Sequence, residues 1–210
     1  MSEKFGLVTL KLGMLETNCY IVSDPLTSEA LIIDPGGEAD RIIRTINEKK
    51  LLPVAIVNTH GHADHISANE ALRKYFKIPL CIHKDDAPFL KDTRLNGSSM
   101  LPGHLTAPAE ADVLLENGSE LKAGSLVFKV IHTPGHTPGG ICLYLDGVLF
   151  TGDTLFRGDI GRSDLAGGDE DALMRSLRVF KDYPPATIIY PGHGPASVLR
   201  KEFSENPYLA

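Results

Sequence analysis

Thr59-His60-Gly61-His62-Ala63-Asp64-His65 is the stretch that decides the fold and the chemistry of this sequence, because three histidines and an aspartate fall within its last six residues. A helix would turn His60 and His62 roughly 200° away from each other, so one helical face cannot present both imidazoles to a single metal ion. We therefore expect a loop here, leaving a strand predicted at 54–57, in which Gly61 relaxes the backbone. Such a loop can aim both rings the same way and suits one metal ion.

Asp64 and His65 are expected at the start of the next helix, where exposed backbone amides favour a carboxylate. Both side chains are available for a second ion. Three later segments place similar side chains at turns that close predicted strands, namely Thr133-Pro134-Gly135-His136, Thr151-Gly152-Asp153 and Tyr190-Pro191-Gly192-His193. We expect these turns to converge on one edge of a sheet.

The candidate metal ligands are five histidines and two aspartates: His60, His62, Asp64, His65, His136, Asp153 and His193. A catalytic zinc normally takes three protein ligands and leaves a position open for water. Seven ligands therefore indicate two ions roughly 3.5–4 Å apart that share a carboxylate, because a carboxylate can bridge where an imidazole cannot. Asp153 is the expected bridge.

The other three histidines of the sequence stand outside this set. A histidine taken alone is more often an ordinary surface or core residue than a ligand. His83 and His104 lack ligand-type neighbours and are predicted not to bind metal. His132 lies four residues before His136, and it either orients a ligand from behind or packs in the core.

Hydrophobic periodicity predicts a mixed α/β chain with two similar halves. Strands are expected at 7–12, 20–22, 30–33, 54–57, 126–131, 141–145, 148–151 and 187–190, and helices around 39–46, 68–75 and 173–180. Strands followed by helices in both halves favour two sheets packed face to face with helices outside, a four-layer αββα sandwich. The segment from about Asp85 to Ala111 is expected to be a loop-rich crossover between the halves. We predict one domain over residues 1–210.

Composition excludes several classes of protein. The 210 residues are 42% hydrophobic and 23% charged, as in a globular protein, and the net charge of −6 argues against a broad nucleic-acid-binding face. No apolar run approaches the roughly 18 residues needed to span a bilayer, and no secretory signal is recognised. The three cysteines are far apart and form neither a disulfide framework nor a zinc pair. A reducing, cytoplasmic location is expected.

The quoted motifs, together with Thr154-Leu155-Phe156 and Pro191-Gly192-His193-Gly194, closely resemble those of the metallo-β-lactamase-fold hydrolases. The resemblance covers about residues 7–194 and is greatest to the glyoxalase II group, the hydroxyacylglutathione hydrolases. It implies that His60, His62 and His136 bind a first metal, that Asp64, His65 and His193 bind a second, and that Asp153 bridges them. True β-lactamases of this fold typically have cysteine at the bridging position and lack the histidine at His65, while flavodiiron relatives carry an acidic residue at His62. Both readings are therefore disfavoured.

One departure concerns the C-terminus. Glyoxalase II enzymes usually append a helical domain that helps to hold glutathione, whereas only 17 residues, 194–210, follow His193. The chain is therefore expected to lack that domain and to resemble the compact, single-domain glyoxalase II-like branch. Persulfide dioxygenases, which use one iron, share much of segment 155–164 and are the nearest alternative. A lactone hydrolase and a noncatalytic metal-binding module are the others.

The function predicted from these observations is hydrolysis of a hydroxyacyl thiol such as S-lactoylglutathione. Two divalent ions would lower the pKa of a bridging water toward about 7 and so supply a hydroxide beside the carbonyl. Zinc is the ion expected first, with iron or manganese as alternatives. Asp64 either serves only as a ligand or also orients the water. Arg157 and Arg162 flank a loop after Asp153, where they fix ligands, meet an acidic substrate or form surface ion pairs.

Overall fold

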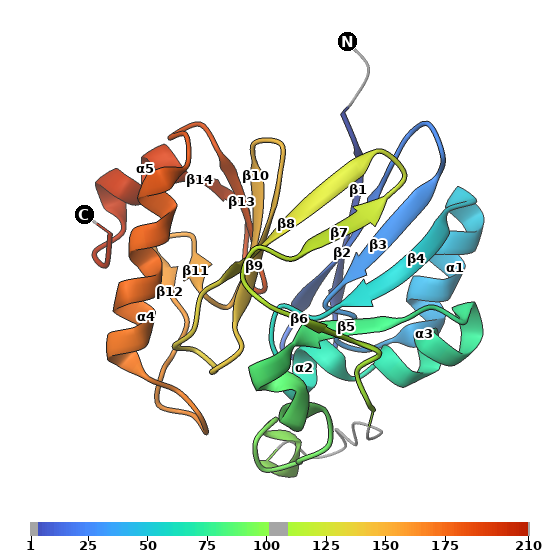
Figure 1. Cartoon of the computed structure of the whole chain (residues 1–210), viewed down its shortest axis with the longest axis horizontal. Coiled ribbons are helices and arrows are strands. Elements are labelled where there is room, and N and C mark those ends of the chain that lie inside the picture. The colour runs from blue at the N-terminus through green and yellow to red at the C-terminus, as the bar shows by residue number, and fades with distance from the viewer. Residues whose placement is uncertain (1–3, 101–108, 210) are drawn as a thin grey trace.

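Two six-stranded β-sheets form the centre of the computed structural model, which describes residues 4–100 and 109–209 (Figure 1). The first sheet has its strands in chain order: β1 (Gly6–Leu12), β2 (Thr17–Ser23), β3 (Glu29–Ile33), β4 (Leu52–Val57), β5 (Leu80–His83) and β6 (Val113–Leu115). The second has the order β14-β13-β10-β9-β8-β7. Its strands are β7 (Glu120–Ala123), β8 (Leu126–His132), β9 (Ile141–Leu145), β10 (Val148–Gly152), β13 (Ile188–Pro191) and β14 (Ser197–Val198).

Helices cover the outer face of each sheet (Figure 1). The first sheet carries α1 (Ala39–Lys49) and α3 (Asn69–Phe76), and the second carries α4 (Glu170–Ser176) and α5 (Leu199–Glu205). The short helix α2 (Ala63–Ile66) lies at the end of the sheets. The remaining elements are the 3₁₀ helices η1 (Lys84–Leu90), η2 (Ser98–Met100) and η3 (Leu177–Asp182) and the small hairpin of β11 (Leu155–Phe156) and β12 (Asp159–Ile160).

Three apolar cores separate the four layers. Alternation along β2 shows how the sequence builds them, since Ile21 faces α1 and α3 while Tyr20 and Val22 face the second sheet. On the far side, η3 and α5 bury Phe180 and Leu199 against the second sheet. The predicted αββα sandwich is confirmed.

Helix α1 shows why these segments are helical. Ile42 and Ile46 are fully buried and lie one turn apart on the face that meets the first sheet, and each contributes about 1.5–3 kcal/mol through burial. Asp40 lies in the first turn, and Lys50 ends the helix in a left-handed conformation while its backbone N–H donates to Asn47 O and Ile46 O. The helix connects two parallel strands, β3 and β4, as α4 connects β10 and β13.

Several elements were absent from the sequence-based expectation. Strands β5, β6 and β7 and helix α5 had no predicted counterpart. The expected crossover is formed by η1, η2 and turns up to residue 100, and its part at 101–108, including His104, lies outside the described residues. All three cysteines are free and buried. In the described part of the chain, no helix is long and apolar enough to cross a membrane.

Candidate metal centre

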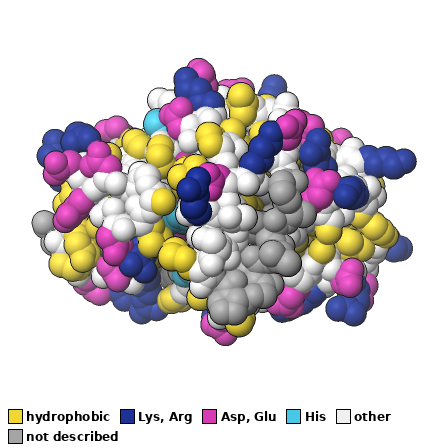
Figure 2. All heavy atoms as spheres, turned by 90° about the horizontal axis from the view of Figure 1, so that it is seen from below, with side chains coloured by type: hydrophobic (Ala, Val, Ile, Leu, Met, Phe, Trp, Pro, Cys, Tyr) yellow, Lys and Arg dark blue, Asp and Glu magenta, His cyan; other side chains and the backbone are white. Residues whose placement is uncertain are grey.

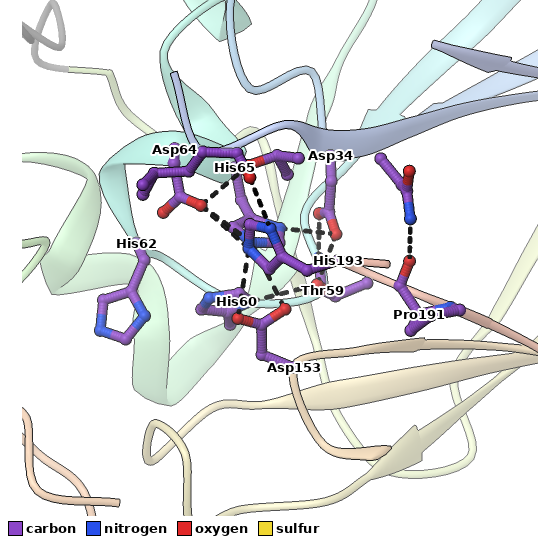
Figure 3. Close-up of polar contacts among 12 residues, drawn as sticks. Asp34, Thr59, His60, His62, Asp64, His65, Asp153, Pro191 and His193 are labelled. Carbon is purple, nitrogen blue, oxygen red and sulfur yellow. Dashed lines mark hydrogen bonds and ion pairs between the residues drawn. The ribbon is translucent and has the colours of Figure 1, made fainter. Parts of the chain in front are cut away.

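The ends of four strands bring all seven predicted ligand residues to one edge of the two sheets. All of them except His136 are labelled in Figure 3. His60 and His62 follow β4, His136 follows β8, and the residues after β10 and β13 are Asp153 and His193. Residues 58–62 form an irregular segment, as expected, and α2 begins at Ala63 and carries Asp64 and His65. Because β3–β4 and β10–β13 are parallel pairs, their carboxyl ends open on the same side.

One group of ligand atoms consists of His60, His62 and His136, whose ligating atoms lie within 4.8 Å of one another. His62 Nδ1 is 2.9 Å from His136 Nε2. The Nε2 atom of His60 is buried and has no hydrogen-bond partner. A buried nitrogen without a partner is costly unless something else takes its lone pair, and a metal ion would do so.

A second group contains Asp64, His65 and His193. His65 Nε2 lies 3.3 Å from His193 Nε2, and Asp64 Oδ2 lies 3.1 Å from His193 Nε2 and 3.4 Å from His65 Nε2. The dashed contacts in Figure 3 join these side chains. Three ligand-type atoms therefore share one small volume.

The Asp153 carboxylate lies between the two groups. Its Oδ2 is 3.6 Å from both His136 Nε2 and His193 Nε2, and its Oδ1 is 3.5 Å from His65 Nε2. Oδ1 is also buried without a hydrogen-bond partner. One side chain thus faces a histidine of the first group and both histidines of the second, which is the arrangement that a bridging carboxylate requires.

Hydrogen bonds on the far side of the rings fix which nitrogen faces the centre. The Nδ1 atom of His136 lies 2.6 Å from the carbonyl oxygen of Arg162, and that of His193 lies 3.0 Å from the carbonyl oxygen of Leu15. A carbonyl oxygen only accepts, so each Nδ1 carries the hydrogen and the Nε2 lone pair faces the centre. His65 Nδ1 donates in the same way to Asp34 Oδ2 at 3.0 Å. The lone pairs therefore converge, as metal ligands require.

His60 is oriented through a relay. The Thr59 hydroxyl donates to Asp34 Oδ2 at 2.6 Å, so its oxygen is free to accept from His60 Nδ1 at 3.2 Å. This leaves the Nε2 lone pair of His60 directed inward. Asp34 thereby orients His65 directly and His60 through Thr59.

Burial and charge set the pKa values of these groups. Burial, together with the neighbouring histidines, lowers the pKa of His60 well below its usual value and that of His62 to about 3, so both rings stay neutral and able to bind a cation. For His65 burial acts in the same direction, but the carboxylates of Asp64, Asp153 and Asp34 outweigh it and raise its pKa to about 10. The pKa of Asp64 is lowered because its histidine neighbours outweigh the opposing effect of burial. An uncompensated cluster of carboxylates thus attracts positive charge here.

Asp34, Thr17 and Asn18 support the candidate ligands, and the sequence pattern did not single them out. Asp34 directly follows strand β3, as Asp153 directly follows β10. Thr17 Oγ1 donates to Asp64 Oδ2 at 2.8 Å. Asn18 Nδ2 donates to the carbonyl oxygens of Pro191 and Gly194 at 3.0 and 2.8 Å, which holds the loop of His193 against β2. The position of Asp34 after a strand was a usable signal, whereas the contacts of Thr17 and Asn18 span distances that no local pattern reveals.

Asp86 joins the two loops of the first ligand group. Its Oδ2 accepts from Gly61 N at 2.8 Å and from Thr137 Oγ1 at 2.7 Å, and its Oδ1 accepts from Gly139 N at 2.6 Å. The side chain is fully buried, and burial raises its pKa despite these hydrogen bonds. The carboxylate therefore sets the spacing between the loop of His62 and the loop of His136.

Gly192 is required by close packing at the centre. A Cβ atom at this position would collide with Asp153 Oδ1 and with the ring of His65. The chain passes so close to the ligands here that only glycine fits.

A different group of ligand-type residues lies at the ends of β5 and β8. His83 and His132 stack with their ring centroids 4.0 Å apart and an interplanar angle of 12°, and Asp85 lies beside them. His132 Nε2 donates to the carbonyl oxygen of Pro138, and His83 Nδ1 accepts from the backbone N–H of Asp85. Ring lone pairs lie in the ring planes, so two parallel rings cannot aim at one ion. His132 thus supports the loop of His136 from behind, and His83 stays a predicted non-ligand.

A pocket of about 550 Å³ opens beside the candidate centre and is lined by His62, Asp64, His136, Asp153 and His193 among others. Its size is that of a site for a small organic molecule. Arg162 also lines it, but its guanidinium forms two hydrogen bonds with Asp164, at 2.6 and 2.7 Å. Arg157 is exposed and is not among the lining residues.

Comparison with known proteins identifies the family. Residues 12–193 match the metallo-β-lactamase superfamily. The chain belongs to this superfamily. Membership supports a metal-dependent hydrolase and agrees with the two sheets and the histidine and aspartate clusters described above.

Relatives of this superfamily resemble the chain along nearly its whole length. It is 38% identical to the probable metallo-hydrolase YqgX of Bacillus subtilis over 95% of both chains, and 36% identical to the hydroxyacylglutathione hydrolase GloC of Haemophilus influenzae over 92% of this chain and 93% of GloC. The crystal structure of the BLEG-1 B3 metallo-β-lactamase superposes with a TM-score of 0.92 at 41% identity, covering 97% of this chain and 99% of that one. TTHA1623 in a di-iron-bound form gives a TM-score of 0.87 at 35% identity, covering 96% and 100%.

Proposed function

We propose that this protein is a dinuclear metal-dependent hydrolase that cleaves thioesters of hydroxy acids. The observation that carries the proposal is the convergence of histidine lone pairs from two groups on a shared carboxylate, that of Asp153. In this proposal His60, His62 and His136 hold one divalent ion, and Asp64, His65 and His193 hold the other. The identity with GloC supports the thioester.

The chemistry that two bound divalent ions supply is a water of lowered pKa and a polarised substrate carbonyl. Asp64 contributes an ionised carboxylate, one oxygen of which accepts from Thr17. Its other oxygen would orient the water by accepting a hydrogen bond from it. A thioester suits a site of this kind because the leaving thiolate is much less basic than an alkoxide and needs no strong general acid.

The metal ions themselves are part of the proposal. Imidazole and carboxylate ligands accept zinc, iron or manganese. Zinc is our first choice, and the di-iron form of TTHA1623 keeps iron as the alternative. We favour two ions over the single iron of a persulfide dioxygenase, because two histidines and one carboxylate suffice for such an iron and would leave the other converging ligand residues without an ion.

The test starts from protein stripped of metal by a chelator and reloaded separately with Zn²⁺, Fe²⁺ or Mn²⁺. We expect about two ions per chain, release of thiol from S-lactoylglutathione by the loaded protein, and none by the stripped protein. One tightly held iron, with oxygen uptake on glutathione persulfide and no thiol release, would contradict the proposal. Loaded protein that is inert to every thioester, ester and lactone tested would instead favour a noncatalytic metal-binding module.

Hydrolysis of β-lactams is a second candidate, and the 41% identity to the BLEG-1 B3 metallo-β-lactamase favours it. The same site serves both reactions, since each requires attack of water on a carbonyl held beside the metal ions. A chromogenic cephalosporin assayed on the same loaded sample separates the two. We expect its kcat/KM to be at least about tenfold below that for S-lactoylglutathione, and the reverse order would make β-lactam hydrolysis the leading function.

A further inference from the structure

The pocket beside the candidate metal centre has two chemically different parts. One part consists of ligand residues, and the other is largely apolar and consists of Leu15, Met100, Phe156, Ile160 and Leu165. Figure 2 looks onto this end of the molecule, where histidine atoms are visible between hydrophobic side chains. Asn96, Gly97 and Arg162 are the other described residues that line the pocket.

The apolar wall is assembled from separate segments. Leu15 comes from the turn between β1 and β2, Phe156 and Ile160 come from the β11–β12 hairpin, and Leu165 comes from the loop that follows. The Phe156 ring lies 6.2 Å from the ring of His193, centroid to centroid. The wall therefore begins directly beside a ligand side chain and extends away from it.

The wall offers little to pair with a charged substrate group. Among the described residues that line the pocket, Arg162 is the only lysine or arginine, and Asp164 already compensates its charge with two hydrogen bonds. A charged group placed against this wall would lose its hydration without gaining a partner, whereas an apolar chain would gain by leaving water.

The volume of the pocket also bears on substrate size. A lactoyl group has three carbons and would leave most of about 550 Å³ to water. Pockets of this size usually hold larger ligands and bury most of their surface. A longer apolar acyl chain would fill it.

We propose that the pocket binds the acyl group of the substrate and selects thioesters with an extended apolar acyl chain, while the polar thiol carrier projects toward solvent. This proposal rests on the proposed thioesterase function and names its substrate class. Leu15, Phe156, Ile160 and Leu165 are then the residues that determine specificity.

The first experiment varies the acyl end of the substrate while the thiol carrier stays glutathione. Glutathione thioesters of lactate, 2-hydroxybutanoate, 2-hydroxypentanoate and 2-hydroxyhexanoate are compared with the metal-loaded protein. We expect kcat/KM to rise roughly threefold with each added methylene. An acyl chain of the same length that ends in a carboxylate should fall at least about tenfold below its apolar counterpart.

The second experiment removes the wall. Leu15→Gln should flatten the dependence on chain length, so that kcat/KM for the 2-hydroxyhexanoyl thioester falls by a larger factor than kcat/KM for the lactoyl thioester. Leu15 is about half exposed, so the variant is expected to fold, and Leu165→Gln provides an independent replacement. Leu26→Gln is the matched control, because Leu26 lies in another turn, is 85% exposed and does not line the pocket.

The outcomes separate the two proposals. Hydrolysis of every thioester in the series at similar rates, or rates that fall as the acyl chain lengthens, would overturn the substrate class and leave the thioesterase function standing. Failure to hydrolyse any member of the series would overturn both. A steep dependence that persists in both Leu15→Gln and Leu165→Gln would show that this wall does not select the substrate.

Discussion

Two groups of histidine and aspartate residues lie near each other in this protein, and they differ in how their rings are oriented. In the candidate metal centre the ring of His136 makes angles of 81° and 77° with those of His62 and His60. In the other group the rings of His83 and His132 are nearly parallel, at 12°. Sets of three ligand-type atoms lie within 4.8 Å of one another both in the centre and around the stacked pair. Crossed rings can direct their in-plane lone pairs at one point, whereas stacked parallel rings cannot. Orientation, more than the number of ligand residues, distinguishes a metal site from a packed cluster.

The largest expected effect follows from removing the shared carboxylate. Asp153→Ala should lower thioesterase activity at least about a thousandfold and reduce the metal content below two ions per chain. Circular dichroism should show an unchanged fold, since Asp153 lies in a turn after β10. Asp182→Ala, at an exposed carboxylate outside the centre, is the control and should retain activity. If Asp153→Ala retains both metal ions and the wild-type rate, Asp153 is not the shared carboxylate of the centre.

The second prediction concerns the hydrogen bonds that orient the ligand rings from the side facing away from the centre. Asp34→Asn removes the charged acceptor for His65 Nδ1 and for the Thr59 hydroxyl. Metal affinity should fall about 10- to 100-fold, as is typical when such a partner is lost. Competition with a chromophoric chelator measures this, and exposed Asp40→Asn is the control. Equal affinities in both variants would show that ring orientation is maintained without Asp34.

The third prediction compares two neighbouring aspartates. Asp86 joins the loops of the first ligand group, whereas Asp85 lies beside the stacked pair of His83 and His132. Asp86→Asn replaces an acceptor of Gly61 N and Thr137 Oγ1 by a donor, so the free energy of unfolding should fall by about 1–3 kcal/mol, with weaker metal binding by the first group. Asp85→Asn changes only the neighbourhood of His83 and should leave metal affinity unchanged. Urea unfolding and metal titration measure both. Weaker metal binding by Asp85→Asn would contradict the separation of the two groups.

The smallest effect, on the free energy of unfolding, is expected from replacing His83 in the stacked pair of His83 and His132. Burial, with a further contribution from His132, lowers the pKa of His83, which also faces Asp85, Lys84 and Glu116. The unfolded chain takes up a proton near pH 6.5 while folded His83 does not, so its contribution to stability is present above that pH and is lost as the pH falls below it. Unfolding of wild type and His83→Asn between pH 7.5 and 5 should therefore differ by less than about 1 kcal/mol, with the wild type losing more stability toward acid. An opposite slope would mean that His83 gains a proton on folding.

The convergence of the candidate ligand residues could be predicted from the sequence because these residues follow a local rule. His136, Asp153 and His193 each stand at a turn after a recognisable strand, and His60 to His65 are contiguous. The αββα layers followed from apolar alternation and helical spacing. The ends of the strands and helices that these local patterns predict agree with the structure to within a few residues.

The remainder depends on contacts between distant segments. Strand β5 has only four residues, all buried, so it has no alternation to reveal it. Asp86 contacts Gly61 and Gly139 across 25 and 53 residues, and the apolar wall combines Leu15 with Phe156 and neighbouring residues. No local pattern encodes such pairings, because they arise only when the two halves pack.

Metal stoichiometry tests the central claim most directly. Wild-type protein and His83→Asn are dialysed to equilibrium against Zn²⁺, and the zinc bound per chain is measured by elemental mass spectrometry. We expect two ions per chain in both proteins, because all the converging lone pairs belong to the seven residues of the candidate metal centre and none belongs to His83. Fewer than two ions in the wild type, or loss of one ion in His83→Asn, would contradict it.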